Sequence, residues 1–141
     1  MDRRHLLMAT GAALAAVTLS AESAEKADHH HDHGGSPLLH SAAHCVETAN
    51  ACLAHCFDRL ADGDKSMAAC ARSVTSLIAV CNALEVLAAQ HSPLLPKYAA
   101  VAADVCRACE EECNKHSEHP PCQACADACK ACAAECAKIA T

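Results

Sequence analysis

CQACADACKACAAEC, residues 122–136, places a cysteine at every third or fourth position. At about 100° per residue, this 3-4-3-4 spacing confines its cysteines to an arc of roughly 80° on one face of a helix. Alanine, the best helix former, fills most of the intervening positions. Pro120 and Pro121 stand just before the stretch, where a first helical turn tolerates proline. The stretch therefore predicts a helix, from about Pro120 to the C-terminus, that carries one continuous stripe of thiols.

Three other segments repeat this stripe. Working back along the chain, their cysteines span arcs of about 60°, 20° and 40°. The thirteen cysteines on the four stripes are Cys45, Cys52 and Cys56; Cys70 and Cys81; Cys106, Cys109 and Cys113; and Cys122, Cys125, Cys129, Cys132 and Cys136. Leucine normally occupies such a seam in a helix bundle, so we expect the bundle axis to be lined with thiols. Val74, Leu77, Leu84, Val101 and Val105 are expected to continue neighbouring core positions.

Helix start and stop signals divide the chain into four helices. Ser and Asp are good N-caps, proline is tolerated in a first turn, and glycine often ends a helix. The expected helices run from Ser36-Pro37 to about Ala61, from Asp64 to about His91, from Ser92-Pro93 to about His116, and from Pro120-Pro121 to the C-terminus. The connections between them are short, which favours antiparallel neighbours. The sequence therefore predicts an all-α fold, an antiparallel four-helix bundle with a cysteine-lined core.

The composition limits how this bundle is stabilised and what it binds. The chain has one Phe, one Tyr and no Trp, so Ala, Cys and scattered Leu and Val must fill the core. Burial of apolar surface stabilises a fold by roughly 25 cal/mol per Å², and such a core buries little of it. Small domains of this kind usually rely on disulfides or metal for further stability. A formal net charge of −6 argues against nucleic acid or an anionic membrane surface as the main partner.

The N-terminal segment has the layout of an export signal. Arg3 and Arg4 precede Leu6-Leu7 and an apolar, Ala-rich run to about Leu19, as in a cleavable signal peptide. The arginine pair is similar to that of a twin-arginine signal, with a chance pair in a general secretory signal as the alternative. We assign residues 1–24 to this signal. The assignment predicts an exported protein, periplasmic or otherwise outside the cytoplasm of a bacterium, with no membrane segment after cleavage.

A polar linker separates this signal from the bundle. Residues 25–36 contain His29, His30, His31 and His33 and include a Gly-Gly pair. These histidines can gather divalent metal, but the composition favours a flexible, solvated tail. Residues 37–141 are assigned to the metal-binding bundle.

Three outcomes compete for a core lined with thiols. Cysteine can act as a small buried hydrophobe, but thirteen cysteines on four matched stripes exceed that role. A disulfide framework would make a disulfide-stapled structural or interaction protein. Cysteines three or four apart on one helix fit disulfide geometry poorly, however, and an odd count leaves one thiol over. Soft metal ions are the third outcome, because thiolates one turn apart can clamp an ion between them.

Charge distinguishes between the soft ions. A Zn(II) ion with four thiolates carries a net 2− charge, and the predicted seam has no Lys or Arg to offset it. Cu(I) and thiolate in a one-to-one ratio are neutral. The seam therefore favours Cu(I), at about one ion per cysteine, with Zn(II) or another thiophilic metal as the alternative. Because the sequence offers no HExxH cluster and no Ser/His/Asp set, we expect storage or buffering of the ions and no enzyme activity.

The runs CxxCxxxC at Cys106–Cys113 and CxxCxxxCxxCxxxC at Cys122–Cys136 resemble those of the copper storage proteins, a family of cysteine-rich four-helix bundles. The resemblance covers the chain from about residue 37 to its end, with a twin-arginine-like leader as in the exported bacterial members. It implies a homotetramer of bundles, each holding several Cu(I) ions along its core by cysteine pairs and bridges. It also implies that His and Met complete the sites of copper entry at one bundle end, a role that His55 and Met67 fit by position.

The antiparallel order predicts which end this is. One end of the bundle gathers the end of the first helix, the start of the second, the end of the third and the start of the fourth. The residues expected there are His55, Cys56, Met67, Cys70, Cys113, His116, His119 and Cys122. Neutral imidazole and thioether hold Cu(I) more weakly than thiolate, which suits sites that must pass ions on. We therefore expect copper to enter at this end.

Overall fold

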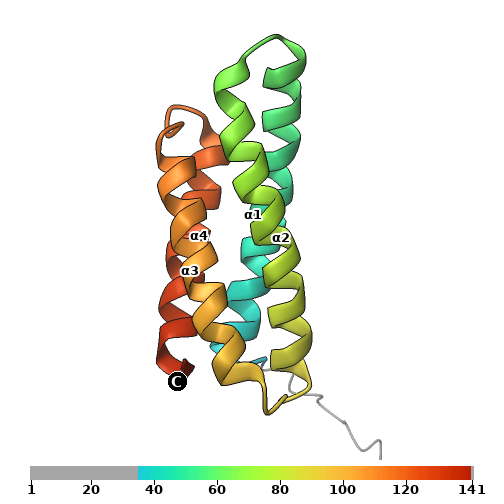
Figure 1. Cartoon of the computed structure of the whole chain (residues 1–141), viewed down its shortest axis with the longest axis vertical. Helices are drawn as coiled ribbons and strands as arrows, with labels where there is room; N and C mark the ends of the chain where they lie inside the picture. Colours follow the sequence, from blue (N-terminus) through green and yellow to red (C-terminus); the bar gives the residue numbers. More distant parts are fainter. Residues whose placement is uncertain (1–34, 141) are drawn as a thin grey trace, which may run out of the picture. The chain divides into compact units, whose positions relative to one another are not determined.

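The computed structural model describes residues 35–140, and over this range the chain forms four α-helices and one short 3-10 helix (Figure 1). The elements are α1 (Pro37–Ala61), η1 (Lys65–Met67), α2 (Ala68–Ala89), α3 (Leu95–Asn114) and α4 (Pro120–Ile139). This architecture confirms the predicted all-α four-helix bundle. The predicted signal peptide, residues 1–24, and most of the predicted linker, residues 25–36, lie outside the described residues.

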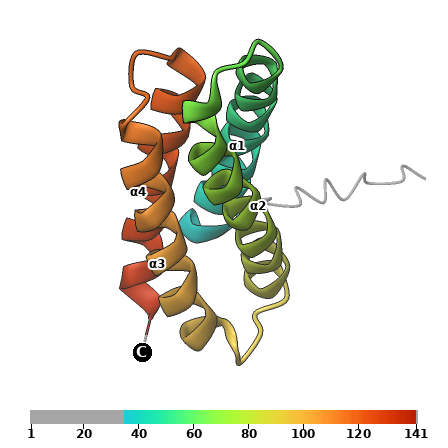
Figure 2. The same ribbon diagram turned by 45° about the horizontal axis from the view of Figure 1, so that its top comes forward.

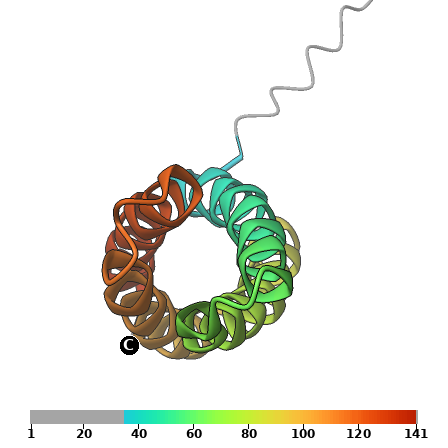
Figure 3. The ribbon, with the colours of Figure 1, turned by 90° about the horizontal axis from the view of Figure 1, so that it is seen from above.

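The four helices surround a single axis. α1 packs against α2 and α4, and α3 packs against the same two helices. Consecutive helices run in opposite directions, which Figure 2 shows along their length and Figure 3 from one end. The α1–α2 and α3–α4 connections therefore lie together at one end, at the top of Figure 1, and the α2–α3 connection lies at the other.

The predicted starts of the first and last helices are confirmed. The Ser36 side chain caps α1 by accepting a hydrogen bond of 3.3 Å from the backbone N–H of Leu39, and Pro37 opens the helix. Pro120 and Pro121 open α4 in the same way, because a first-turn residue needs no backbone N–H partner.

Glycine ends α1 as its position predicts. Gly63 has a φ of 91°, which an L side chain rarely adopts. Its N–H donates to the carbonyl of Leu60, and the N–H of Asp64 donates to that of Arg59. These two bonds form a Schellman motif, which satisfies the last carbonyls of α1 and turns the chain towards α2.

Two predicted helix starts differ from the structure. Asp64 caps the 3-10 helix η1, accepting a 3.2 Å hydrogen bond from the N–H of Ser66, so that α2 begins only at Ala68. α3 begins at Leu95 rather than at the predicted Ser92-Pro93 cap. The Ser92 hydroxyl instead accepts from the N–H of Leu94, two residues on, which closes a turn before the helix starts.

The cysteine stripes form the core. All thirteen cysteine side chains are fully buried, as are the predicted core residues Val74, Leu77 and Leu84. The prediction for Val101 is wrong, because this residue is 53% exposed and Ala102 and Ala103 beside it face inward. Val105 is partly buried and packs against the core.

Apolar side chains line the core at the end of the bundle near the α2–α3 connection, beside a hollow of about 360 Å³ whose lining also includes His91, Glu135 and Lys138. Leu38 of α1 and Ala88 of α2 are buried there, and Ala99 of α3 is buried on the same stretch of the core. Most of the cysteines thus occupy the middle of the bundle and the end near the α1–α2 and α3–α4 connections, and Cys136, three residues before the end of α4, lies towards the α2–α3 end.

Candidate metal centre

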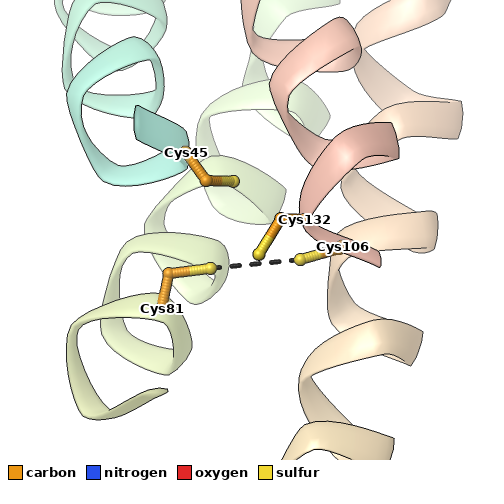
Figure 4. A group of neighbouring side chains, drawn as sticks. All are labelled: Cys45, Cys81, Cys106 and Cys132. Carbon is orange, nitrogen blue, oxygen red and sulfur yellow. Dashed lines mark hydrogen bonds between the residues drawn. The ribbon is translucent and has the colours of Figure 1, made fainter. Parts of the chain in front are cut away.

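One group of four sulfurs takes a single ligand from each helix. Cys45 lies on α1, Cys81 on α2, Cys106 on α3 and Cys132 on α4, and their Sγ atoms all lie within 4.8 Å of one another. The Sγ atoms of Cys81 and Cys106, on the neighbouring helices α2 and α3, are 3.9 Å apart, and Figure 4 marks this contact with a dashed line. We call these residues the four-helix cluster. An ion bound by them would tie all four helices together.

A second group of four lies nearer the α1–α2 connection. This group, which we call the mouth cluster, consists of Cys52, Cys56, Cys70 and Cys122. The Sγ of Cys52 lies 3.7 Å from that of Cys122 and 3.9 Å from that of Cys70. Cys45 of the four-helix cluster and Cys56 of the mouth cluster are eleven residues apart on α1. At a rise of 1.5 Å per residue, this spacing corresponds to roughly 16 Å along the helix.

The sulfurs between the two clusters connect them. Two groups of three buried cysteines bridge the gap: Cys52, Cys113 and Cys125, and Cys109, Cys125 and Cys129. Cys129 in turn lies 3.9 Å from Cys45, and Cys113 lies 3.7 Å from Cys70. Cys136, one turn beyond Cys132 on α4, is the remaining buried cysteine. The thiols thus form one continuous column along the bundle axis.

The spacing within this column fits metal rather than disulfides. All thirteen cysteines are free. Their closest Sγ–Sγ distances are 3.7–3.9 Å, against about 2.0 Å in a disulfide. Tetrahedral thiolate bonds of about 2.3 Å place neighbouring sulfurs roughly 3.8 Å apart, so a bound soft ion requires little movement of these side chains.

Each of the four groups contains one sulfur that favours the thiolate form. Hydrogen bonds from neighbouring S–H groups hold the pKa of Cys52, Cys109 and Cys132 below that of an ordinary thiol, and Cys52 belongs to two of the groups. The largest contribution comes from Cys113 at Cys52 and Cys109, and from Cys106 at Cys132. Because the thiolate is the metal-binding form of cysteine, these three residues are the expected first ligands in their groups.

The other thiols for which a shift is resolved are held in the neutral form. A raised pKa is found for Cys45, Cys56, Cys70, Cys106, Cys113, Cys122, Cys125 and Cys136. Burial is the main cause at Cys56 and Cys122. At Cys70, the hydrogen bond with Cys113 lowers the pKa, but the hydrogen bond with Cys52 and burial outweigh it and raise the pKa to about 11. The copper-free interior is therefore largely uncharged.

These pKa shifts predict how the stability of the copper-free protein depends on pH. An unfolded chain loses its thiol protons near pH 8.5–9, whereas the folded chain retains the eight raised ones to higher pH. The eight thiols with a raised pKa contribute fully to the free energy of unfolding below pH 8.5, and this contribution is lost as the pH rises towards their folded pKa values. The contribution of the three thiols with a lowered pKa changes little above pH 9. For Cys70 alone the rise to about 11 corresponds to roughly 2–3 kcal/mol.

The measurement is urea unfolding of the reduced, copper-free protein under anaerobic conditions at pH 8 and pH 10.5. We expect the free energy of unfolding to be lower at pH 10.5. The Cu(I)-loaded protein is the control, because its thiols have no proton to lose and only the Lys and Tyr contributions remain. Equal pH dependence in the two forms would contradict the prediction.

The described interior offers no cation to balance buried thiolates. Among residues 35–140, His116 is the only buried residue that is polar or charged, with 9% of its surface exposed. Burying a net charge without a partner costs several kcal/mol per ion. The column therefore suits an ion that neutralises its thiolates one for one.

Imidazole and thioether groups lie at the end of the bundle nearest the mouth cluster, which we call the mouth. The rings of His55 on α1 and His119 at the start of α4 are in contact, with centroids 4.7 Å apart. The Nε2 atom of His55 is buried and has no hydrogen-bond partner. Met67, in η1, is fully buried just before α2, three residues before Cys70. An unpartnered imidazole nitrogen and a buried thioether at the same end of the bundle are donors that a soft ion can use.

Arg59, which precedes the α1–α2 turn, stabilises the rim of this end. Its guanidinium lies 3.3 Å from a carboxylate oxygen of Asp64 and 3.9 Å from one of Asp62. These charges are partly exposed and pair with one another. They therefore act on the connection rather than on the thiols.

The structure brings together the residues that the antiparallel order placed at the mouth. Cys56, Cys70 and Cys122 share one cluster, and His116 is buried near the α3–α4 connection. His119 was not predicted as a ligand, and its contact with His55 makes it a candidate. The only signal in the sequence was its position at the start of the fourth helix, where topology rather than any local motif sets its neighbour.

A four-helix bundle with a continuous column of free, buried thiols belongs to the class of proteins that bind several soft metal ions. The family described as copper storage protein (Csp) matches residues 33–141. The chain therefore belongs to the copper storage protein family, which is a family of metal-storage proteins and not of enzymes.

Solved structures and a curated relative agree with this membership. The chain is similar to the Cu(I)-bound Copper Storage Protein BsCsp3, with a TM-score of 0.68 and 30% identity over 74% of this chain and 95% of that one. It is also similar to apo copper storage protein 3 from Bacillus subtilis, with a TM-score of 0.65, 30% identity and coverage of 74% and 97%. The "uncharacterized cysteine-rich protein YhjQ" of Bacillus subtilis (strain 168) is 38% identical over 85 residues, which are 58% of this chain and 76% of that protein.

Proposed function

We infer that this protein stores copper as Cu(I), bound by the thiolates of its core, with about one ion per cysteine. The single observation that carries this function is the column of thirteen buried, free thiols along the bundle axis. Soft thiolate ligands select Cu(I), and the solved relative named above is a Cu(I)-bound protein of the same family. We propose all thirteen cysteines as ligands, with His55 and Met67 completing the sites at the mouth.

The proposed stoichiometry follows from charge. Each Cu(I) that replaces a thiol proton leaves the interior as neutral as it was, however the sulfurs bridge the ions. A Zn(II) ion in the four-helix cluster would instead carry a net 2− charge, and the part of the core that the structure describes supplies no Lys or Arg to offset it. Filling with Cu(I) can therefore continue until the thiols are used up.

Anaerobic titration of the reduced protein with Cu(I) tests this function. We expect binding to continue to roughly one ion for each of the thirteen cysteines, with about one proton released per ion because most of the thiols are protonated at pH 7. The readouts are the bound copper after gel filtration and the protons released in weak buffer. A plateau at three or four ions, or stronger retention of Zn(II) than of Cu(I) in competition, would contradict it.

We also propose that the protein is exported. The support is in the sequence, where Arg3 and Arg4 precede an apolar run of signal-peptide length. Twin-arginine export carries folded cargo, and a folded bundle keeps its thiols buried in an oxidising compartment. N-terminal sequencing of the secreted form would locate the cleavage site.

A homotetramer is the proposed assembly. The segment Lys65–Ala89 is apolar enough, and long enough, to meet the criteria for a membrane span, yet it is one of the bundle's helices and only 39% of its most apolar window is buried. Apolar side chains such as Val86, 54% exposed, are thus uncovered on its outer surface in a single chain. Phe57, 58% exposed, lines a hollow of about 360 Å³ beside it, together with Ala71 and Thr75. Packing of two copies on this face would cover both features, and the tetramer implied by the family resemblance requires a second contact between two such pairs. Sedimentation analysis would report the assembly.

A further inference from the structure

Two histidines lie one turn apart on the outer surface of α1. His40 and His44 are both exposed, and their i, i+4 spacing places them on the same face of the helix. Together with Gly35, Ala43 and Glu47 they line a surface hollow of about 490 Å³. Neither histidine belongs to the thiol column or to the mouth.

The carboxylate of Glu47 lies close to one of these imidazoles. Nδ1 of His44 lies 3.5 Å from Oε2 of Glu47, one turn further along the helix. This exposed contact is too long for a hydrogen bond, but a carboxylate on the Nδ1 side of the ring favours the tautomer that carries the proton there and leaves the Nε2 lone pair free for an ion. The hollow gives an ion at Nε2 room for further ligands such as water.

The chain also passes unusually close to His40. A Cβ atom placed on Gly35 would lie 3.0 Å from both Cδ2 and Nε2 of the His40 ring. A side chain at this position would require the His40 ring, and the equally close Leu39 side chain, to shift by a few tenths of an ångström. The backbone at Gly35 therefore forms one wall of the hollow and confines the imidazole of His40 beside α1.

The ligands of this hollow differ from those of the core in kind and in place. Two imidazoles at i, i+4 on a helix suit borderline divalent ions, with Cu(II) bound more tightly than Ni(II) or Zn(II). His40 and His55 are fifteen residues apart on α1, which corresponds to roughly 22 Å at 1.5 Å per residue. His44 precedes Cys45, yet it is exposed whereas Cys45 is fully buried.

We propose that His40 and His44, with the carboxylate of Glu47 beside His44, form a surface site for one divalent borderline ion, Cu(II) being the tightest. The site is separate from the Cu(I)-thiolate core and lies towards the opposite end of α1 from the mouth. It requires no electron transfer and no change in the core, because both imidazoles are already exposed on a formed helix.

The experiment uses the full chain with His29, His30, His31 and His33 changed to Ala, because these four histidines of the N-terminal segment could bind the same ions. The core is first filled with Cu(I) under anaerobic conditions, since free thiols would reduce Cu(II). Cu(II) is then titrated and followed by electron paramagnetic resonance, in which Cu(I) is silent. We expect one Cu(II) per chain with nitrogen hyperfine structure.

Three variants in this background decide the assignment. We expect His40→Ala/His44→Ala to weaken Cu(II) binding at least 30-fold, and Glu47→Gln to weaken it several-fold. The control is His91→Ala, which removes an exposed histidine at the α2–α3 connection and should leave Cu(II) binding unchanged. Unchanged affinity in the double variant, or equal loss in His91→Ala, would overturn the proposal.

Two further readouts keep this test independent of copper storage. The Cu(I) count is measured on every sample and should be the same in all variants, so a failure of the core to load is seen separately. Ni(II), which thiols do not reduce, is added to the copper-free protein, and we expect broadened imidazole signals from His40 and His44 in the nuclear magnetic resonance spectrum. Broadening confined to other histidines would overturn the proposal whatever the core binds.

Discussion

Loading with Cu(I) is expected to raise the melting temperature of the reduced protein by more than about 30 °C. An ion present at a thousand times its Kd stabilises the folded state by about 4 kcal/mol. In a domain of this size, each 1 kcal/mol shifts the melting temperature by roughly 4–8 °C. The four-helix cluster has one ligand from each helix, so ions bound there alone would link all four helices.

Differential scanning calorimetry at increasing copper-to-protein ratios is the measurement. The midpoint should rise with each of the first few ions rather than only at saturation. Circular dichroism of the copper-free, reduced protein is the control, and it should already show a helical spectrum, because Leu77, Leu84 and Val74 are buried without any metal. A random-coil spectrum would mean that copper creates the fold, and a shift below 10 °C would mean that the ions do not bridge the helices.

The features that could be predicted from the sequence are those set by one helix at a time. The spacing from Cys122 to Cys136 determines a stripe whatever the stripe packs against, and the signals at Ser36-Pro37 and Gly63 act through hydrogen bonds within a few residues. Because every stripe is made of one residue type, burying them together requires a common axis. The bundle and its thiol column therefore follow from local spacing and the hydrophobic effect.

The errors fall where neighbouring elements compete with a local signal. The Ser92 hydroxyl is a good helix cap, but the chain needs a turn there to bring α3 back along α2, and His91 takes a φ of 49° to make it. Val101 is apolar, yet the seam of α3 is already filled by Ala102 and Ala103. The division of the sulfurs into four groups depends on distances across the axis, which no spacing within a single helix contains.

The arrangement of the mouth depends both on spacing within one helix and on the packing of different helices. His55 precedes Cys56 on α1, but its partner His119 is supplied by the antiparallel return of α4. The result is a pair of imidazoles and a thioether at the end of the column where thiolates begin. At the opposite end, the buried Leu38 and Ala88 are apolar and supply no ligand, and His91 is the imidazole in the lining of the hollow of about 360 Å³ beside them. We therefore propose that ions enter and leave past His55 and Met67.

Changing His55 to Ala together with Met67 to Leu is expected to slow both Cu(I) uptake and its removal by a chelator by roughly 10- to 100-fold, the usual cost of losing a group that supports a metal site. Leucine retains the volume of the fully buried Met67 while removing its sulfur. The final count should stay within about one ion of the unmodified protein, because the thirteen cysteines are unchanged. Stopped-flow transfer from a Cu(I) chelate measures the rates, with His91→Ala at the opposite end as the control. Uptake at the unmodified rate would place the entrance elsewhere. A lower final count with normal rates would make His55 and Met67 storage ligands rather than carriers, because a group that only passes ions on changes the rate of filling and not the final number of bound ions.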